Sequence, residues 1–377
     1  MTNRLPKSVI SFCRDEESLS LFENFVDFWN HYRSETGTKK YPYATTDRNG
    51  NPISFAQKED AIGKLILKEV SKLSGIDVTS MPPERMATHP MVSWAIGNIE
   101  TQLIDAVLPQ TIIDGTSAFC EVRTVGWGET AIFDIRSRDL FPVTKSGKLG
   151  MREAELHKGF ERQVTVNPEA HMVSTYVSLL RVLAGQESLG VFVTKCLRSI
   201  ETEMYKDIYN AFAAGMSALE TNPASGSATA LKVTGYSMES MMQLAARVQA
   251  FSGGAKPILL GTKVALSKVV PSGSNYRYDI ESPFVRLGYV REIAGLETLE
   301  IPQVANWETP FGTIINDNYL WIIAPSTDKI VKCVIGGTMM SNTSDVYANA
   351  NLVQTSTLTK FWKIGVHTSA IGALISL

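Results

Sequence analysis

The sequence predicts an α+β protein, and three features of the 377-residue chain lead to that prediction. A long stretch with helical periodicity occupies residues 186–219. Stretches that alternate between apolar and polar residues begin at Thr116, which is typical of half-buried strands. A mixture of strand and helix patterns fills residues 231–355. We therefore expect helices and sheets in more than one unit.

Composition indicates a globular chain that is long enough for two or three domains. The chain is 44% hydrophobic and 20% charged, and its net charge is -2. This balance gives no electrostatic reason to expect tight, non-specific binding of nucleic acid. No apolar run reaches the length of a membrane span, and residues 1–6 lack the apolar core of a secretory signal. We expect neither a membrane partner nor secretion.

Three helices with modest apolar faces are expected in the first 115 residues. The first spans residues 16–33, and the second opens with the capping box Ser54–Gln57. The third runs from Met91 to Leu108 and is expected to end at Pro109. These helices fit two alternatives, a small bundle or an arm that lies over neighbouring chains.

A long two-stranded hairpin is expected after the helices. Alternating patterns at residues 119–125 and 131–135 are followed by a polar stretch around Ser146-Gly147, a turn dipeptide, and the pattern resumes at residues 164–166. A ribbon with so little apolar surface is marginal alone, so we expect it to pack on its own domain or on another subunit; a solvated surface hairpin is the plainer alternative. Its charged residues are Arg136, Arg138, Asp139, Lys145, Lys148, Arg152, Glu153, Glu155 and Lys158.

Residues 186–219 form the predicted spine helix, ~45–50 Å long at ~1.5 Å per residue. Apolar residues recur at steps of three and four, which places them on one face of the helix. They follow no strict seven-residue repeat, so the pattern does not indicate a coiled coil. We expect this face to lie on a sheet. The face consists of Leu189, Val193, Leu197, Ile200, Met204, Ile208, Phe212 and Met216.

One charge, Glu201, lies near this apolar face. It is a candidate for an ion pair with a basic group on a neighbouring element or subunit. The alternative is a carboxylate at the edge of the apolar face, partnered by Arg198 three residues earlier.

The block at residues 231–355 is expected to be a separate α/β unit. Ser237 caps a helix that ends at Gly253, and residues 257–260 form a buried strand before a short helix at 262–269. Residues 360–371 resemble strands that return to the sheet under the spine helix.

No catalytic, cofactor or metal site is expected. Gly126-Trp-Gly128-Glu-Thr-Ala131 superficially matches a dinucleotide motif, but it lies between two strand patterns, so a bend is the better interpretation. Gly261-Thr262-Lys263 lacks the glycine spacing of a phosphate loop. The histidines and cysteines lack metal-ligand spacing, and the cysteines are expected to be reduced core residues. These are His31, His89, His157, His171 and His367, with Cys13, Cys120, Cys196 and Cys333.

The order of these elements resembles the major capsid proteins of tailed bacteriophages that share the Hong Kong ninety-seven fold. The local match is best at residues 104–110, through the spine helix, and at residues 256–268, and the resemblance covers about residues 90–377. It implies an N-terminal helical arm, an extended β-hairpin loop, a peripheral domain with the spine helix on a β-sheet, and an α/β axial domain. The implied segments are the arm at 1–115, strands and extended loop at 116–167 (tip about 136–158), the peripheral domain at 168–230, the axial domain at 231–355, and a C-terminal strand at 356–377 that returns to the peripheral domain.

The resemblance also implies a structural function. Subunits would form pentamers and hexamers in an icosahedral shell around double-stranded DNA, which they would contact non-specifically, with portal, scaffolding and cement proteins as further partners. The chain would be a virion component, assembled in the host cytoplasm. Lys145 and Lys148 lie where some relatives form a lysine–asparagine cross-link, but no asparagine partner is identified and a non-covalent shell is preferred.

Two other functions fit the sequence. One is an encapsulin-like compartment of the same fold that encloses a protein cargo, and the other is a cytosolic α/β enzyme that uses residues 231–355. The capsid interpretation depends on a helix and a ribbon too extended to be satisfied within one molecule, so that copies of the chain complete each other's surfaces.

Overall fold

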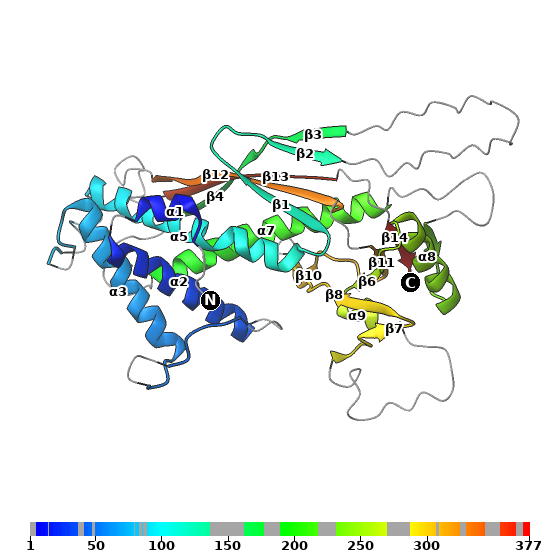
Figure 1. Ribbon diagram of the computed structural model, residues 1–377. Coiled ribbons are helices and arrows are strands. Elements are labelled where there is room, and N and C mark those ends of the chain that lie inside the picture. Colours follow the sequence, from blue (N-terminus) through cyan, green and yellow to red (C-terminus); the bar gives the residue numbers. More distant parts are fainter. Residues whose placement is uncertain are drawn as a thin grey trace, which may run out of the picture.

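The fold consists of a large body and a smaller lobe, arranged along a line in Figure 1. The structure is a computed structural model. It describes residues 5–13, 15–36, 41–46, 50–78, 80–82, 85, 89–135, 162–176, 189–217, 231–269, 287–306, 309–324, 329–343, 355–366 and 372–377. The body contains the N-terminal helices, a four-stranded sheet and the spine helix, and the lobe contains a six-stranded sheet. This mixture confirms the α+β class.

Helices dominate the first part of the chain and strands the last. The helices are α1 (Lys7–Phe12), α2 (Glu16–Thr36), α3 (Phe55–Ser74), α5 (Pro90–Thr116), α7 (Leu189–Ser217), α8 (Met238–Phe251) and α9 (Lys263–Ser267). The strands are β1 (Cys120–Val125), β2 (Ala131–Ile135), β3 (Arg162–Val166), β4 (Glu169–Tyr176), β5 (Lys232–Thr234), β6 (Ile258–Gly261), β7 (Glu292–Ile293), β8 (Leu296–Glu300), β9 (Ala305–Asn306), β10 (Gly312–Thr313), β11 (Tyr319–Ile323), β12 (Val331–Thr343), β13 (Thr355–Val366) and β14 (Gly372–Ser376).

Helix α5 is the centre of the body. Its apolar residues are not confined to one face, and from Ala95 to Leu108 all of its residues are buried or half-buried. It contacts α2 and α3 on one side and α7, β1 and β12 on the others. The expected end at Pro109 is wrong, because α5 continues to Thr116. Proline costs the helix one backbone hydrogen bond, but the buried side chains of Leu108 and Ile112 hold both flanking turns in the core.

The first three long helices form a bundle, not a detached arm. The capping box at Ser54 starts α3 as expected: its hydroxyl accepts from the Gln57 amide, and the Gln57 side chain accepts from the Ser54 amide. Phe25, Phe28 and Trp29 of α2 are fully buried in one core with α3, α5 and α7. The expected boundary of an arm at residue 115 therefore does not describe this chain, because α5 belongs to the core of the body.

The four-stranded sheet has the order β1-β12-β13-β4, in which only the β1–β12 pair is parallel. We call the face toward α5 and α7 the inner face and the opposite one the outer face. Neighbouring residues point to opposite faces, so Leu358, Lys360 and Trp362 of β13 are buried on the inner face while Thr359 and Phe361 point outward. Between Gly336 and Met340 the register of β12 shifts, which marks a β-bulge.

Helix α7 is the predicted spine helix, and it lies along the inner face of the sheet (Figure 1). Gly215 permits close approach at its C-terminal end, since a Cβ there would lie 2.7 Å from Val366 Cγ1 on β13. Its apolar face is closed within this one chain: Leu197, Met204 and Phe212 are all at most 1% exposed. The expectation that the helix needs neighbouring copies to cover it is therefore wrong, because α5, the sheet and the lobe already do so.

The lobe is built on a sheet with the order β5-β14-β11-β6-β8-β7. Trp321 of β11 points toward α7 and packs edge-on against Phe212, whereas Leu320 and Ile322 point to the core under α8 and α9. Two expected boundaries need correction. Residues 331–343 form strand β12 of the body, because the chain returns from the lobe to the body after β11. Strand β14 belongs to the lobe, because the chain crosses to the lobe again after β13; of the two strands in residues 356–377, β13 is the one that pairs in the sheet on α7.

Candidate functional site

The strands β2 and β3 form the base of the expected hairpin, and we call this pair the ribbon. They pair antiparallel from Ala131–Val166 to Ile135–Arg162 as a separate two-stranded sheet. The ribbon lies over the outer face of the four-stranded sheet, opposite α7 (Figure 1). The chain enters it through a turn after β1 and leaves it directly into β4.

The ribbon is anchored by one aromatic side chain. Phe133 is 0% exposed and packs with Ala131 and Val166 onto Val334 of β12. Two cations of the outer face cover its ring, since the Arg123 guanidinium lies 4.5 Å and the Lys332 amine 5.5 Å from its centroid.

Polar contacts complete this anchor. The Arg123 guanidinium also donates to the Ile132 carbonyl, and the Lys332 amine lies 2.7 Å from the Glu121 carboxylate. The base of the ribbon is therefore fixed to the body, while Ile132 on its other side is 48% exposed.

The predicted contact residues of the extended loop lie outside the described residues. This applies to Arg136, Arg138, Asp139, Lys145, Lys148, Arg152, Glu153, Glu155 and Lys158. Their contact with a neighbouring subunit stays a prediction.

Glu201 lies on α7 where α2 passes close to it. Burial raises the pKa of its carboxyl, and the Arg33 and Arg198 guanidinium groups lower it in part. Arg33 donates to the Tyr41 hydroxyl at 2.6 Å and faces Asp114 at 3.4 Å, while Arg198 lies over the Tyr32 ring. Arg33 from the neighbouring helix α2 and Arg198 from α7 thus both lie near Glu201. A direct ion pair between Glu201 and either of them stays a prediction.

The inner face holds a buried ion pair that was not predicted from the sequence. The Lys360 amine lies 2.6 Å from one Asp105 oxygen, and both side chains are at most 5% exposed. The other Asp105 oxygen accepts from the Met339 amide at 2.7 Å, and Lys360 donates to the Gly337 carbonyl at 2.7 Å. The pair thus joins α5 to the bulge of β12. An isolated aspartate in the otherwise apolar stretch of residues 103–108 was the signal that could have revealed it.

Chemically reactive groups are dispersed over the described residues. In that part of the chain, no group of three or more His, Cys, Asp or Glu side chains could hold a metal ion. His31 faces Glu35 at 2.9 Å, and His171 stacks on Trp362. The four cysteines are free, and burial raises the pKa of Cys196 to about 12, which leaves it a thiol. No described helix is long and apolar enough to cross a membrane.

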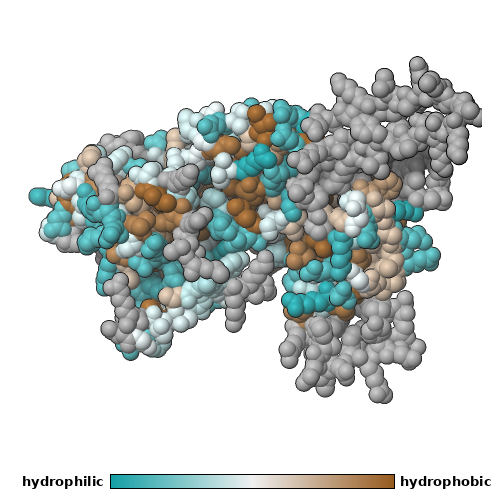
Figure 2. All heavy atoms as spheres, viewed as in Figure 1, coloured by the Kyte–Doolittle hydropathy of each residue, from teal (hydrophilic) through white to brown (hydrophobic). Residues whose placement is uncertain are grey.

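The outer face carries exposed apolar side chains beside the ribbon. Met340 and Met172 flank Thr359 in the register of the sheet, and they are 43% and 67% exposed. With Ile132 and Trp127, which is 63% exposed, they form the candidate association surface. Figure 2 shows hydrophobic residues at the surface around the ribbon, interspersed with polar ones. Exposed apolar side chains that gather in one region are candidates for contact with another protein surface.

Comparison with known proteins gives matches in structure alone. No family model and no curated protein matches the chain. The mature capsid of bacteriophage PhiM1 is similar in fold, with 12% identity and a TM-score of 0.44 over 69% of this chain and 86% of that one. The capsid of a native GTA particle matches with 11% identity and a TM-score of 0.44 over 70% and 89%. A virus-like particle from Pyrococcus furiosus matches with 10% identity and a TM-score of 0.37 over 71% and 97%.

Proposed function

We propose that the chain is a major capsid protein, which assembles through pentamers and hexamers into the icosahedral shell of a tailed bacteriophage. Its role is then structural and not catalytic, and its place is the virion, after assembly in the host cytoplasm. The shell encloses double-stranded DNA. Because the chain has a net charge of -2, it contacts this DNA non-specifically and does not bind it tightly.

The observation that carries this proposal is the order of the elements in space. A ribbon anchored on the outer face of a sheet, a long helix along the inner face, a separate α/β lobe and a strand that returns to the first sheet all occur in one chain. This is the order that the resemblance to capsid proteins requires.

The packing changes the physical reason for assembly. The spine helix does not need other copies, because its apolar face is closed within one chain, so contacts between copies fall to the ribbon and the outer face. The core of the body is closed within the chain, so each copy can act as a rigid unit in assembly. The ribbon and the exposed apolar side chains on the outer face then supply contacts between copies.

The charged residues of the extended loop act in this proposal as contacts at the rim of the interface. Opposite charges there set register and orientation, while each exposed pair contributes little free energy. The stability of the shell comes from large buried areas that are repeated in every subunit. Portal, scaffolding and cement proteins are further partners of such a shell.

Removal of the loop tests the proposal. A variant in which residues 137–157 are replaced by a short Gly-Ser turn should remain soluble and folded, and it should fail to form closed shells. Sedimentation velocity and circular dichroism measure the two properties. Intact shells from this variant would contradict the role of the loop, and wild-type particles that enclose only a protein cargo would favour the compartment instead.

A further inference from the structure

The glycine-rich motif at residues 126–131 forms the tight turn between β1 and β2. Gly128 has a φ of +75°, which glycine adopts without strain, and the Glu129 carboxylate closes the turn by accepting from the Gly126 amide at 2.7 Å. The turn holds Trp127 edge-on against Phe361 of β13, with ring centroids 5.0 Å apart. The bend expected from the sequence thus presents an indole that is 63% exposed.

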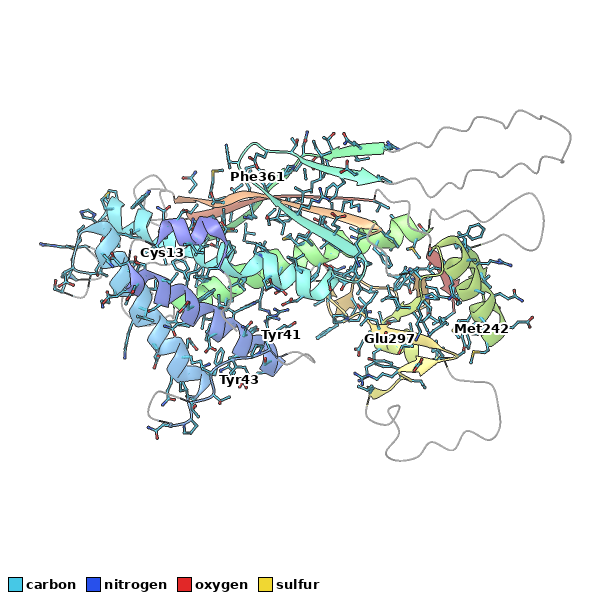
Figure 3. The ribbon with its side chains drawn as sticks, in the orientation of Figure 1. Cys13, Tyr41, Tyr43, Met242, Glu297 and Phe361 are labelled. Carbon is cyan, nitrogen blue, oxygen red and sulfur yellow. The ribbon has the colours of Figure 1, made fainter. Side chains whose placement is uncertain are left out.

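An open groove of about 350 Å³ lies beside this indole. Gly336 and Gly337 from the bulge of β12 form part of its wall. A Cβ at Gly336 would lie 2.7 Å from Pro168, and Gly337 has a φ of +55°, so larger residues are disfavoured at both positions. The lining residues are Gly126, Trp127, Gly128, Glu129, Thr130, Asn167, Pro168, Gly336, Gly337 and Phe361. Figure 3 shows Phe361 at the sheet near this turn.

The lining favours a cationic side chain. It combines two aromatic rings, one carboxylate and one amide, and none of the described residues that line it is a lysine, arginine or histidine. The aliphatic stem of a lysine or arginine packs well on aromatic rings, and its charged end is attracted to a ring face and to a carboxylate. A phosphate-bearing ligand would instead meet the negative charge of Glu129, and none of the helices in the described part of the chain begins at this turn.

We propose that this groove receives a lysine or arginine side chain from a second copy of the chain. This inference rests on the proposed function, in which identical copies meet around the ribbon. The groove is continuous with the exposed apolar residues of the outer face, because Phe361 lies two residues from Thr359 on the same face of β13. A groove on one copy filled by a different region of the next copy is a heterologous contact, which is the kind that closes rings of subunits.

Photo-cross-linking within assembled particles tests the proposal. Thr130 lines the groove and is exposed, so Thr130→p-benzoylphenylalanine places the probe there and leaves Trp127 and Glu129 intact. Particles are assembled from equal amounts of ¹⁴N- and ¹⁵N-labelled chains, irradiated, digested and analysed by mass spectrometry. We expect cross-links between light and heavy chains, to a peptide whose attachment point lies within a few residues of a lysine or arginine.

The outcomes separate this proposal from the proposed function. Cross-links that form only within one chain, or only to peptides without a cation, would overturn the groove contact while particles still form. A chain that forms no particles at all would instead contradict the capsid function, and the groove contact with it.

Charge substitution provides a second test that does not depend on the probe. Glu129→Gln should raise the critical concentration for assembly about threefold to tenfold, and Glu129→Lys should raise it further, since an exposed cation contact contributes on the order of 1 kcal/mol. Glu297→Gln removes an exposed carboxylate on the lobe and is the matched control (Figure 3). Light scattering measures assembly, and thermal melting verifies that the subunits stay folded. Equal critical concentrations for Glu129→Lys and the wild type would contradict the proposal.

Discussion

The two faces of the four-stranded sheet differ in almost every property. On the inner face, Lys360 and Trp362 are buried and bonded to residues of α5 and α7. On the outer face, Met172 and Met340 stay exposed, and the described residues of the ribbon pack around Val334. The inner face therefore holds the subunit together, and the outer face is available for association. Substitutions on one face should change folding, and those on the other should change assembly.

The largest expected effect is on the inner face, at Lys360. Lys360→Ala leaves the Asp105 carboxylate buried without its cation, which should lower the free energy of unfolding by about 3–5 kcal/mol. Urea denaturation followed by circular dichroism measures this loss. Lys363→Ala, three residues along the same strand, removes a partly exposed contact to Glu169 and should cost less than about 1 kcal/mol. Equal effects of the two substitutions would remove the distinction between the faces.

The anchor of the ribbon should give the next largest effect. Phe133→Ala removes a fully buried ring from between Arg123, Lys332 and Val334, at a cost of about 3 kcal/mol. Hydrogen exchange should increase in residues 131–135 and 162–166 and much less in α5. Ile132→Ala, next to it on the exposed side, is the control and should leave exchange unchanged. Unchanged exchange in Phe133→Ala would show that the ring does not fix the ribbon.

The buried carboxyl of Glu100 predicts that the free energy of unfolding depends on pH. Burial raises the pKa of Glu100 on α5 from 4.5 to about 8. The folded protein then keeps a proton that the unfolded chain releases above pH 4.5. The free energy of unfolding should therefore fall as pH rises from about 4.5 to about 8, by at most about 1.4 kcal/mol per unit.

Glu100→Gln tests this dependence, because it retains the shape of the side chain and cannot ionise. It should flatten the pH profile and raise the free energy of unfolding at pH 7.5, measured by urea denaturation between pH 5 and pH 8. A wild-type profile that rises over this interval would contradict the assignment to Glu100.

The smallest effect on stability is expected from the exposed methionines. Met172→Ser and Met340→Ser should each change the free energy of unfolding by less than about 1 kcal/mol, because both side chains are already partly exposed to solvent. The same substitutions should reduce the yield of assembled particles, as measured by sedimentation. Normal assembly in the double variant would place the association surface elsewhere.

The sequence predicted the elements better than their partners. Helical periodicity located α7 and its buried face from Val193 to Met216, and the capping box located the start of α3. Local signals cannot show which distant strand lies beside which, and so β12 and β14 were assigned to the wrong units.

Long-range packing also overrode two local rules. Pro109 stays inside a helix because the surrounding core is strong enough to hold it there, and α5 proved to be the central element although no single face marked it. The Asp105–Lys360 pair joins residues 255 positions apart, which no spacing rule reveals. Of the candidate site, the base of the ribbon was predicted from alternation, while the contacts of Phe133 with two cations required the structure.

Electron microscopy of the purified wild-type chain at micromolar concentration is the sharpest test of whether identical copies assemble into a shell. If the chain is a major capsid protein, we expect closed, regular shells of uniform size. A chain that remains monomeric or dimeric under conditions in which it is fully folded, and never forms larger particles, would contradict the capsid function.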